Sequence, residues 1–289
     1  MSIMPIMPTG EPGDDAPAQV WALDARARLL TTVCDDRRIV WREWGDGAPL
    51  VLLHGGHGSW LHWLRNIDTL SQRFRVIAPD MPSYGDSDAL PRQAGLADYA
   101  SPLLAGIQEI AGGVPVTLCG FSFGAVVAGE IARLAGDEIA RVVFAGAGGL
   151  ALTRPPMAEM VRWRDLAPPA LFEAHRRNLE ILMIADPENV DDTAIWIQAH
   201  NAARTRGLSR PISLGPTLAR NLPQLNQPLA FIWGEKDATA KGYLHERRDL
   251  VKNVAPDAGF SIVAGAGHWL QYEDPAGFEA ALSVHLSAP

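Results

Sequence analysis

The hydrophobic positions of the chain fall into two patterns that alternate along most of its length. Short, continuously apolar runs are typical of strands covered on both faces, and longer segments between them have helical spacing. The predicted strands are 29–34, 38–44, 49–53, 74–78, 114–119, 140–145, 229–233 and 260–263. The predicted helices are 60–71, 97–111, 123–135, 243–254 and 275–286. This alternation predicts an α/β fold with a mostly parallel, doubly wound sheet, preceded by a hairpin that turns at Asp35 and Asp36.

Residues 146–222 break the alternation. They begin with Gly-Ala-Gly-Gly and contain two proline pairs, and their periodic stretches are helical, at 171–185 and 192–205. We therefore expect an all-helical insertion after the sixth strand, with a lid over residues 150–222. The core is then expected in two parts, 20–149 and 223–289. A disordered extension rich in Pro, Gly and Asp is expected over residues 1–19.

Composition narrows the possible partners. The chain has 289 residues and a formal net charge of −8, whereas nucleic acids and anionic membranes attract clustered positive charge. It has no apolar run of membrane-spanning length and no secretory signal pattern. The two cysteines, Cys34 and Cys119, lack the spacing of a disulfide framework or a zinc site. We expect a cytoplasmic protein with no bound metal and no nucleic-acid or membrane partner.

The sharpest chemical signal is Gly120-Phe121-Ser122-Phe123-Gly124, which follows a predicted buried strand and begins a predicted helix. A turn this tight brings backbone segments together and favours glycine on both sides of the serine. It points the serine hydroxyl out of the sheet, next to the free N–H groups of the helix N-terminus. The pattern predicts Ser122 as a nucleophile.

A nucleophilic serine needs a base, and the base needs a third group that orients it. His268 follows a predicted strand, where loops at the carboxyl edge of a sheet form sites. His245 lies in a charged helix and His285 near the chain end, so both are expected to be solvated or structural. The acid is expected after strand 229–233, where Glu235 and Asp237 are both candidates.

The loop His54-Gly55-Gly56-His57-Gly58 follows the buried strand 49–53. Acyl transfer requires two preorganised N–H donors where negative charge develops on the carbonyl oxygen. The N–H of Phe123 is one candidate. The second is expected from this loop, at Gly56 or His57.

Together these motifs resemble those of the α/β-hydrolase superfamily, over residues 29–285. The matching stretches are the loop 54–56, Val76-Ile77-Ala78-Pro79-Asp80-Met81-Pro82-Ser83-Tyr84-Gly85-Asp86-Ser87-Asp88, the Ser122 turn, Trp233-Gly234-Glu235-Lys236-Asp237 and Gly267-His268-Trp269. The resemblance implies Asp237 rather than Glu235 as the acid, and Gly56 and Phe123 as the oxyanion donors. Ser83 stands where the family usually has glycine. A serine nucleophile separates the chain from the dehalogenases and epoxide hydrolases of the family, which carry aspartate there.

The resemblance leaves three functions open. The leading hypothesis is a cofactor-independent serine hydrolase that cleaves a small or medium apolar carboxylic ester through an acyl-enzyme. The tail 267–273 is also similar to that of meta-cleavage-product hydrolases, which cut carbon–carbon bonds in ring-fission products. Those enzymes tend to carry asparagine at the position of Phe121 and an arginine in the lid. In this chain Gln198 or His200 occupies the position of that arginine, and Arg204 is offset from it. These differences favour an ester substrate. The third possibility is a ligand-binding, receptor-like protein with slow turnover.

Aromatic residues are expected to line an apolar pocket between sheet and lid. The candidates for substrate binding are His57, Phe121, Trp163, Trp196 and Trp269. Ordinary core and lid packing is the alternative for each of the tryptophans. The expected partner is a small apolar acyl substrate, bound by a monomer or homodimer.

Overall fold

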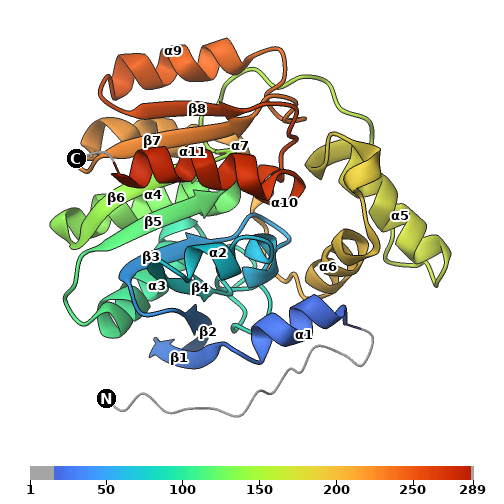
Figure 1. Cartoon of the computed structure of the whole chain (residues 1–289), viewed down its shortest axis with the longest axis horizontal. Coiled ribbons are helices and arrows are strands. Elements are labelled where there is room, and N and C mark those ends of the chain that lie inside the picture. Colours follow the sequence, from blue (N-terminus) through green and yellow to red (C-terminus); the bar gives the residue numbers. More distant parts are fainter. Residues whose placement is uncertain (1–15, 288–289) are drawn as a thin grey trace.

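The computed structural model describes residues 16–287 and centres on an eight-stranded sheet (Figure 1). Its strands are β1 Arg28–Cys34, β2 Arg37–Trp44, β3 Ala48–Leu53, β4 Phe74–Pro79, β5 Val116–Phe121, β6 Ile139–Ala145, β7 Leu229–Gly234 and β8 Gly259–Val263. Their spatial order is β1-β2-β4-β3-β5-β6-β7-β8. β2 runs antiparallel to β1 and β4, and the other neighbours are parallel. The predicted mostly parallel sheet is confirmed.

The predicted hairpin joins β1 and β2 through a two-residue turn. Asp35 and Asp36 have φ values of +47° and +59°, and Cys34 pairs with Arg37 across the ladder. Two central residues with positive φ match the right-handed twist of the flanking strands, and aspartate tolerates this conformation better than most residues.

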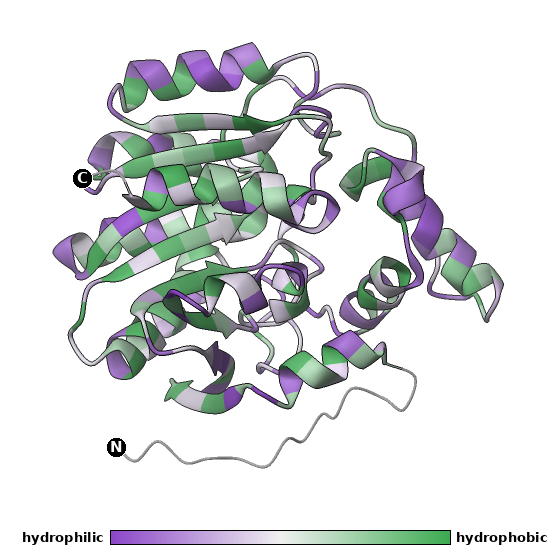
Figure 2. Cartoon of the chain, in the orientation of Figure 1, coloured by the Kyte–Doolittle hydropathy of each residue, from purple (hydrophilic) through white to green (hydrophobic). Residues whose placement is uncertain are grey.

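Helices cover both faces of the sheet and create two separate apolar cores. One face carries α3 Leu96–Ala111, α4 Phe123–Ala135 and α9 Leu244–Val254, and the other carries α1 Ala18–Asp24, α2 Ile67–Leu70, α10 Leu270–Glu273 and α11 Pro275–Ser287. Continuous apolar strands such as β3 and β7 are therefore buried on both sides. Figure 2 shows the inner strands mostly green, whereas α9 carries long purple stretches.

The prediction of one continuous helix over residues 60–71 is wrong. The segment forms a 3-10 turn at Trp60–Trp63 and then the separate short helix α2. Between them Asn66 has φ −113°, which departs from helical geometry. The Arg65 side chain binds the Tyr272 carbonyl and the Asp191 carboxylate, so contacts with distant segments decide the local path.

The part of the insertion between β6 and β7 that carries α5 and α6 lies beyond the carboxyl ends of the strands (Figure 1), and buried residues of α6 join one of the two apolar cores. The helices of the insertion are α5 Ala170–Asn178, a π-helical turn Leu179–Met183, α6 Asp192–Ala203, α7 Arg210–Leu214 and α8 Thr217–Asn221. Short 3-10 turns occur at Gly136–Glu138, Pro187–Asn189 and Leu222–Gln224. The role of the insertion as a lid, with the boundaries 150–222, stays a prediction.

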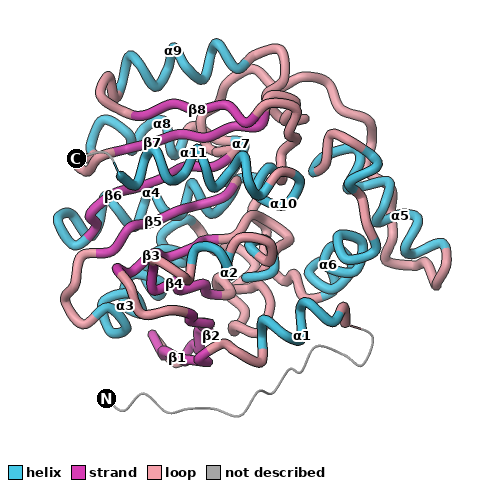
Figure 3. The backbone as a smooth tube through the Cα atoms, in the orientation of Figure 1, coloured by secondary structure: helices cyan, strands magenta, loops and turns pink. Residues whose placement is uncertain are grey.

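The prediction of an all-helical insertion is wrong for residues 150–169, which we call the strap. The strap contains no helix and runs as a long pink loop to α5 in Figure 3. Its two proline pairs remove backbone donors and disfavour helical geometry in the residues before them. Side chains hold it instead: Asn178 exchanges hydrogen bonds of 2.7 and 2.9 Å with the Val161 backbone, and the Trp163 ring lies 5.1 Å from that of His175.

The insertion returns to the core at α8. Asn221 donates to the Glu130 carboxylate of α4 at 2.7 Å, and Leu218 packs so closely on Gly129 that a Cβ there would lie 2.5 Å from its side chain. Residues 217–221 therefore form part of the helical layer on one face of the sheet.

The N-terminal extension ends earlier than expected. Ala18 and Gln19 belong to α1, which buries Val20 and Leu23, and Gln19 donates to Thr193 of α6 at 2.6 Å. The apolar side chains of this segment have helical spacing, so they form one face of the helix that can be buried. The rest of the expected extension, residues 1–15, lies outside the described residues. Within residues 16–287, no helix has the length and apolar character needed to cross a membrane.

Candidate active site

Ser122, His268 and Asp237 meet beyond the carboxyl ends of the strands. His268 Nε2 lies 3.0 Å from Ser122 Oγ, and His268 Nδ1 lies 2.8 Å from Asp237 Oδ2. All three sequence candidates are thus joined in one hydrogen-bonded chain. The structure places the alternative acid, Glu235, elsewhere, with its carboxylate accepting the Gly265 N–H at 2.8 Å.

The backbone explains why the serine stands between two glycines. Ser122 joins β5 to α4 with φ +52° and ψ −108°, and its N–H donates to the Ala145 carbonyl at 2.8 Å. A Cβ on Gly120 would lie 2.4 Å from the Gly124 oxygen, and one on Gly124 would lie 2.3 Å from the Leu53 oxygen. Neither position has room for a side chain, so the sharp turn requires glycine at both.

Asp237 is fully buried and stays ionised through specific contacts. Its Oδ1 accepts the Thr239 N–H at 2.7 Å and the Thr239 hydroxyl at 2.8 Å. Burial raises the pKa of Asp237, but the His268 charge and the hydrogen bonds outweigh it and hold the pKa below its ordinary value. A carboxylate here accepts the His268 Nδ1–H, which leaves Nε2 as the acceptor for the Ser122 hydroxyl.

Sequence reasoning missed Thr239, although a signal was available. Aspartate side chains often accept the backbone N–H two residues later, and a hydroxyl residue at that position adds a second donor. The spacing from Asp237 to Thr239 fits this pattern.

The two predicted oxyanion donors lie together beside Ser122. A Cβ on Gly56 would stand 3.9 Å from the Cβ of Phe123 and 2.4 Å from the Ser209 hydroxyl oxygen. Phe123 is the first residue of α4, so its N–H has no partner within the helix. Ser209, which precedes α7, was not singled out from the sequence because nothing local marks its approach to Gly56.

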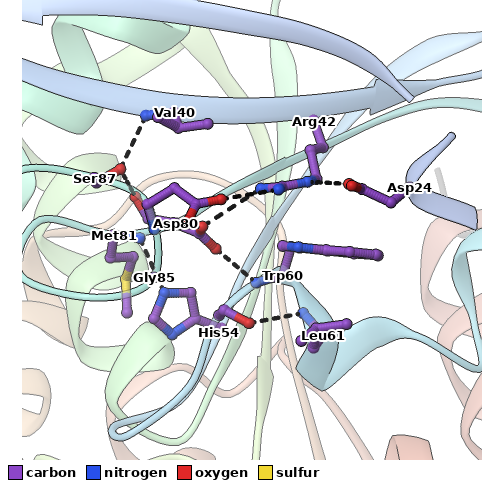
Figure 4. A network of polar contacts seen from close by, with 12 residues as sticks. Asp24, Val40, Arg42, His54, Trp60, Leu61, Asp80, Met81, Gly85 and Ser87 are labelled. Carbon is purple, nitrogen blue, oxygen red and sulfur yellow. Dashed lines mark hydrogen bonds and ion pairs between the residues drawn. The ribbon is translucent and has the colours of Figure 1, made fainter. Parts of the chain in front are cut away.

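Figure 4 shows polar contacts of His54 and Trp60, the two ends of loop 54–60, with the segment that begins at Asp80. The buried His54 accepts the Met81 N–H at Nε2, 2.9 Å away, and Asp80 accepts the Trp60 N–H at 3.0 Å. Burial raises the pKa of Asp80 to about 6, although Arg42 lies 3.4 Å away and opposes the shift. Loop 54–60 is thereby fixed against the segment that begins at Asp80.

Arg42 anchors that segment to the rest of the fold. Its guanidinium is almost fully buried and also pairs with Asp24 at 2.5 Å and Asp86 at 2.9 Å. The sequence identified the stretch 76–88 only by resemblance, and Arg42 only as a strand residue.

Two of the predicted substrate-binding aromatics are buried packing residues. Phe121 and Trp269 are each 1% exposed. The Phe121 ring lies 5.0 Å from the His268 ring, and the Trp269 indole donates to the His62 carbonyl at 2.9 Å. Their contacts support the loop around His268, and their role toward substrate stays a prediction.

The other three candidates lie in different places. Trp163 contacts His175 within the insertion, as described above. Trp196 stacks on His200 at 4.5 Å and lines a small cavity that also includes Arg42. His57 follows Gly56 with φ +53° and is exposed. The role of His57, Trp163 and Trp196 toward substrate stays a prediction.

A cavity of about 340 Å³ borders His268. It runs between the π-helical end of α5 and the loop after β7, and its lining includes Ile181, Leu182, Ile184, Lys236, Lys241 and His268. Its volume falls in the range of small-molecule sites. Within the part of the chain that the structure describes, no group of three or more His, Cys, Asp or Glu side chains is arranged to hold a metal ion.

Comparisons with known proteins give the family. The model of the alpha/beta hydrolase family matches residues 50–281. The chain belongs to this family, and the protein is therefore a hydrolase.

Individual relatives cover more than one kind of hydrolase. A 2-hydroxy-6-oxo-6-phenylhexa-2,4-dienoate hydrolase from Burkholderia cepacia is 28% identical over 255 residues, which cover 82% of this chain and 86% of that protein. A pimeloyl-[acyl-carrier protein] methyl ester esterase from Photobacterium profundum is 25% identical, with 83% of this chain and 92% of that protein covered. The naproxen esterase structure from Bacillus subtilis superposes with a TM-score of 0.72 at 20% identity, covering 91% of this chain and 92% of that one. The last comparison concerns the fold alone.

Proposed function

We propose that the protein is a serine hydrolase that cleaves carboxylic esters of small or medium apolar acyl compounds through an acyl-enzyme. The hydrogen-bonded chain of Ser122, His268 and Asp237 carries this proposal. The esterases among the relatives support it. The small-molecule substrate, the lack of a cofactor and the cytoplasmic location stay predictions.

The proposed mechanism gives each group a role. His268 Nε2 takes the Ser122 proton as the oxygen attacks the ester carbonyl, and Asp237 stabilises the imidazolium that forms. The N–H groups of Gly56 and Phe123 bind the oxyanion of the tetrahedral intermediate. His268 then protonates the leaving alcohol, and in the second half of the cycle it activates the water that releases the acid.

The test is hydrolysis of a p-nitrophenyl ester series, from acetate to octanoate, by the wild type and Ser122→Ala. We expect Ser122→Ala to lower kcat by at least about a thousandfold, because no other group supplies the nucleophile. Its melting temperature and circular dichroism should match the wild type. Ser101→Ala, an exposed serine on α3, is the matched control and should retain full activity.

Turnover by Ser122→Ala at the wild-type rate would overturn the mechanism. If the wild type reacts with a fluorophosphonate probe at Ser122 but hydrolyses no ester of the series, the ester proposal falls while the nucleophile stands.

The second candidate function is hydrolysis of a carbon–carbon bond in a ring-fission product. The Burkholderia cepacia relative, a dienoate hydrolase by name, favours it. Gln198 or His200 stands where such enzymes tend to carry a lid arginine, and Arg204 is offset from that position. Arg204 lies at the end of α6 with its guanidinium 3.1 Å from His200. Bleaching of a yellow dienoate substrate by the wild type would support this function, and no bleaching at high enzyme concentration would exclude it.

A further inference from the structure

A second cavity, of about 30 Å³, lies between the segment after β6, the helix α7 and the helix α9. Its polar lining residues are Arg154, Ser213, Thr239 and Arg247. A cavity needs about 10–15 Å³ of such space to hold one water molecule, so this one admits a small polar group.

The cavity shares walls with the candidate active site. Gly148, on one wall, donates its N–H to the Ser122 carbonyl at 3.2 Å. Thr239, on another wall, holds Asp237 through the two hydrogen bonds described above. The cavity therefore adjoins the residues that position both the nucleophile and the acid.

The loop that carries Gly56, the proposed oxyanion donor, is also close to the cavity. Ser209 contacts Gly56, and the Ser213 N–H donates to the Ser209 carbonyl at 2.9 Å. Ser213 therefore lies one helical turn, about 5 Å, beyond Ser209, the residue that contacts the loop carrying Gly56. The cavity therefore lies one helical turn from the residue that contacts the loop carrying Gly56.

Arg247 is a buried cation whose charge is incompletely compensated. It is 5% exposed, and its guanidinium donates to the carbonyls of Tyr243 and Thr239, both at 3.1 Å. These bonds use two of five N–H donors, and the Glu246 carboxylate stands 3.8 Å away. Burial lowers the pKa of Arg247, and the opposing charges of Asp237 and Glu246 do not restore it. A buried cation in this position gains from an added anion.

Arg154, an exposed residue of the strap, adds a second cation to the lining. Partial burial of its guanidinium lowers its pKa, the Asp237 charge raises it, and the positive charge of Arg210 lowers it further. The two charged residues in the lining, Arg154 and Arg247, are both positive, and the nearby carboxylates of Asp237 and Glu246 do not line the cavity.

We propose that this cavity binds a carboxylate at the far end of the acyl chain, and that the substrates are half-esters of short dicarboxylic acids. The proposal rests on the proposed ester hydrolysis and names its substrate class. Arg154 and Arg247 are the anion-binding residues, and the Ser213 hydroxyl is a further donor.

The kinetic test compares mono-p-nitrophenyl esters of succinate, glutarate and adipate with p-nitrophenyl esters of uncharged acyl chains of equal length. We expect the best anionic ester to exceed its uncharged counterpart in kcat/KM by about tenfold or more, since hydrogen bonds to charged groups are the stronger ones. Arg154→Met should reduce kcat/KM for the anionic ester at least about tenfold more than for the uncharged one. Arg162→Met removes an exposed arginine of the same strap that does not line the cavity, and should change neither value.

A wild type without preference for the anionic ester overturns the proposal, as do equal effects of Arg154→Met and Arg162→Met.

A second measurement is independent of turnover: calorimetric binding of glutarate to the Ser122→Ala protein, with and without Arg154→Met. We expect binding that the second substitution weakens at least about tenfold. If glutarate binds in this way but no ester is hydrolysed, the subsite stands and the ester-hydrolase proposal falls. If uncharged esters are hydrolysed but glutarate does not bind, the subsite falls alone.

Discussion

At the scale of single residues, the site depends on backbone conformations and tautomers that neighbours impose. Ser122 is held at positive φ, which residues other than glycine, asparagine and aspartate rarely adopt. This strain is local and is offset by the tight packing of Gly120 and Gly124. Such turns follow from residue type, so the sequence was sufficient to predict this one.

His54 provides a prediction about acid sensitivity. Its Nε2 accepts the Met81 N–H, so the neutral ring carries its proton on Nδ1, which lies 2.7 Å from the Gly55 carbonyl. Burial lowers the pKa of His54 to about 4, against about 6.5 in the unfolded chain. Between these values the unfolded chain binds more protons, so the stability contributed by His54 is complete above pH 6.5 and is lost as the pH falls toward 4.

We therefore expect the wild type to lose more free energy of unfolding than His54→Asn when the pH falls from 7.5 to 5.0. Urea unfolding at the two pH values measures this difference. His245→Asn replaces an exposed histidine and should behave as the wild type does. Equal losses in His54→Asn and the wild type would show that the ring does not titrate as argued.

At the scale of elements, one carboxylate connects the insertion to the loop that carries His268. Glu273 of α10 accepts N–H groups from Ala185 at 3.0 Å, Asp186 at 2.8 Å and Gly267 at 2.7 Å. The first two belong to the insertion, and the third immediately precedes the histidine. Two carboxylate oxygens can serve both partners at once, whereas an amide has only one acceptor oxygen.

Glu273→Gln is therefore expected to release one of the two partners. We predict a lower melting temperature, a loss of stability on the order of 2–3 kcal/mol and a fall in kcat that exceeds the change in KM. Thermal unfolding and ester kinetics measure these quantities. Glu188→Gln, an exposed glutamate of the insertion, is the matched control. A normal kcat beside a lowered melting temperature would limit Glu273 to a structural role.

At the scale of the whole molecule, the Arg42 network joins parts of the fold that are distant in sequence. Arg42 pairs with Asp24, Asp80 and Asp86, and it thereby connects α1, the sheet and the segment that begins at Asp80 and contacts loop 54–60 (Figure 4). Burial is the main cause of the raised pKa of Asp80, and the Asp86 carboxylate adds to the shift whereas Arg42 opposes it.

Arg42→Met should destabilise the protein by about 3–5 kcal/mol, because it leaves buried carboxylates without their cation. Addition of Asp80→Asn should restore part of that loss at pH 7, since it removes one of the uncompensated charges. Urea unfolding of both variants measures these effects. Arg92→Met, at an exposed loop position, is the control and should stay within about 0.5 kcal/mol of the wild type. A similar value for Arg42→Met would contradict the structural role of the network.

The sequence alone determined what depends on local patterns. Apolar runs and helical spacing predicted the strands and most helices, and glycine, aspartate and serine at fixed positions predicted the β1–β2 turn and the Ser122 turn. The order of strands along the chain also predicted that Ser122, Asp237 and His268 lie at one edge of the sheet. These features follow from the few neighbouring residues that set backbone geometry.

Only the tertiary structure decided how distant segments meet. The strap is ordered by Asn178 and His175, Glu273 reaches Ala185 across 88 residues, and Arg154 joins Arg247 at one cavity. No periodicity marks such pairs, because their energy comes from burying polar groups with partners that the fold supplies. The sequence therefore predicted which three residues meet at the candidate active site, whereas the groups that support them and line the cavity near Arg247 emerge only from packing.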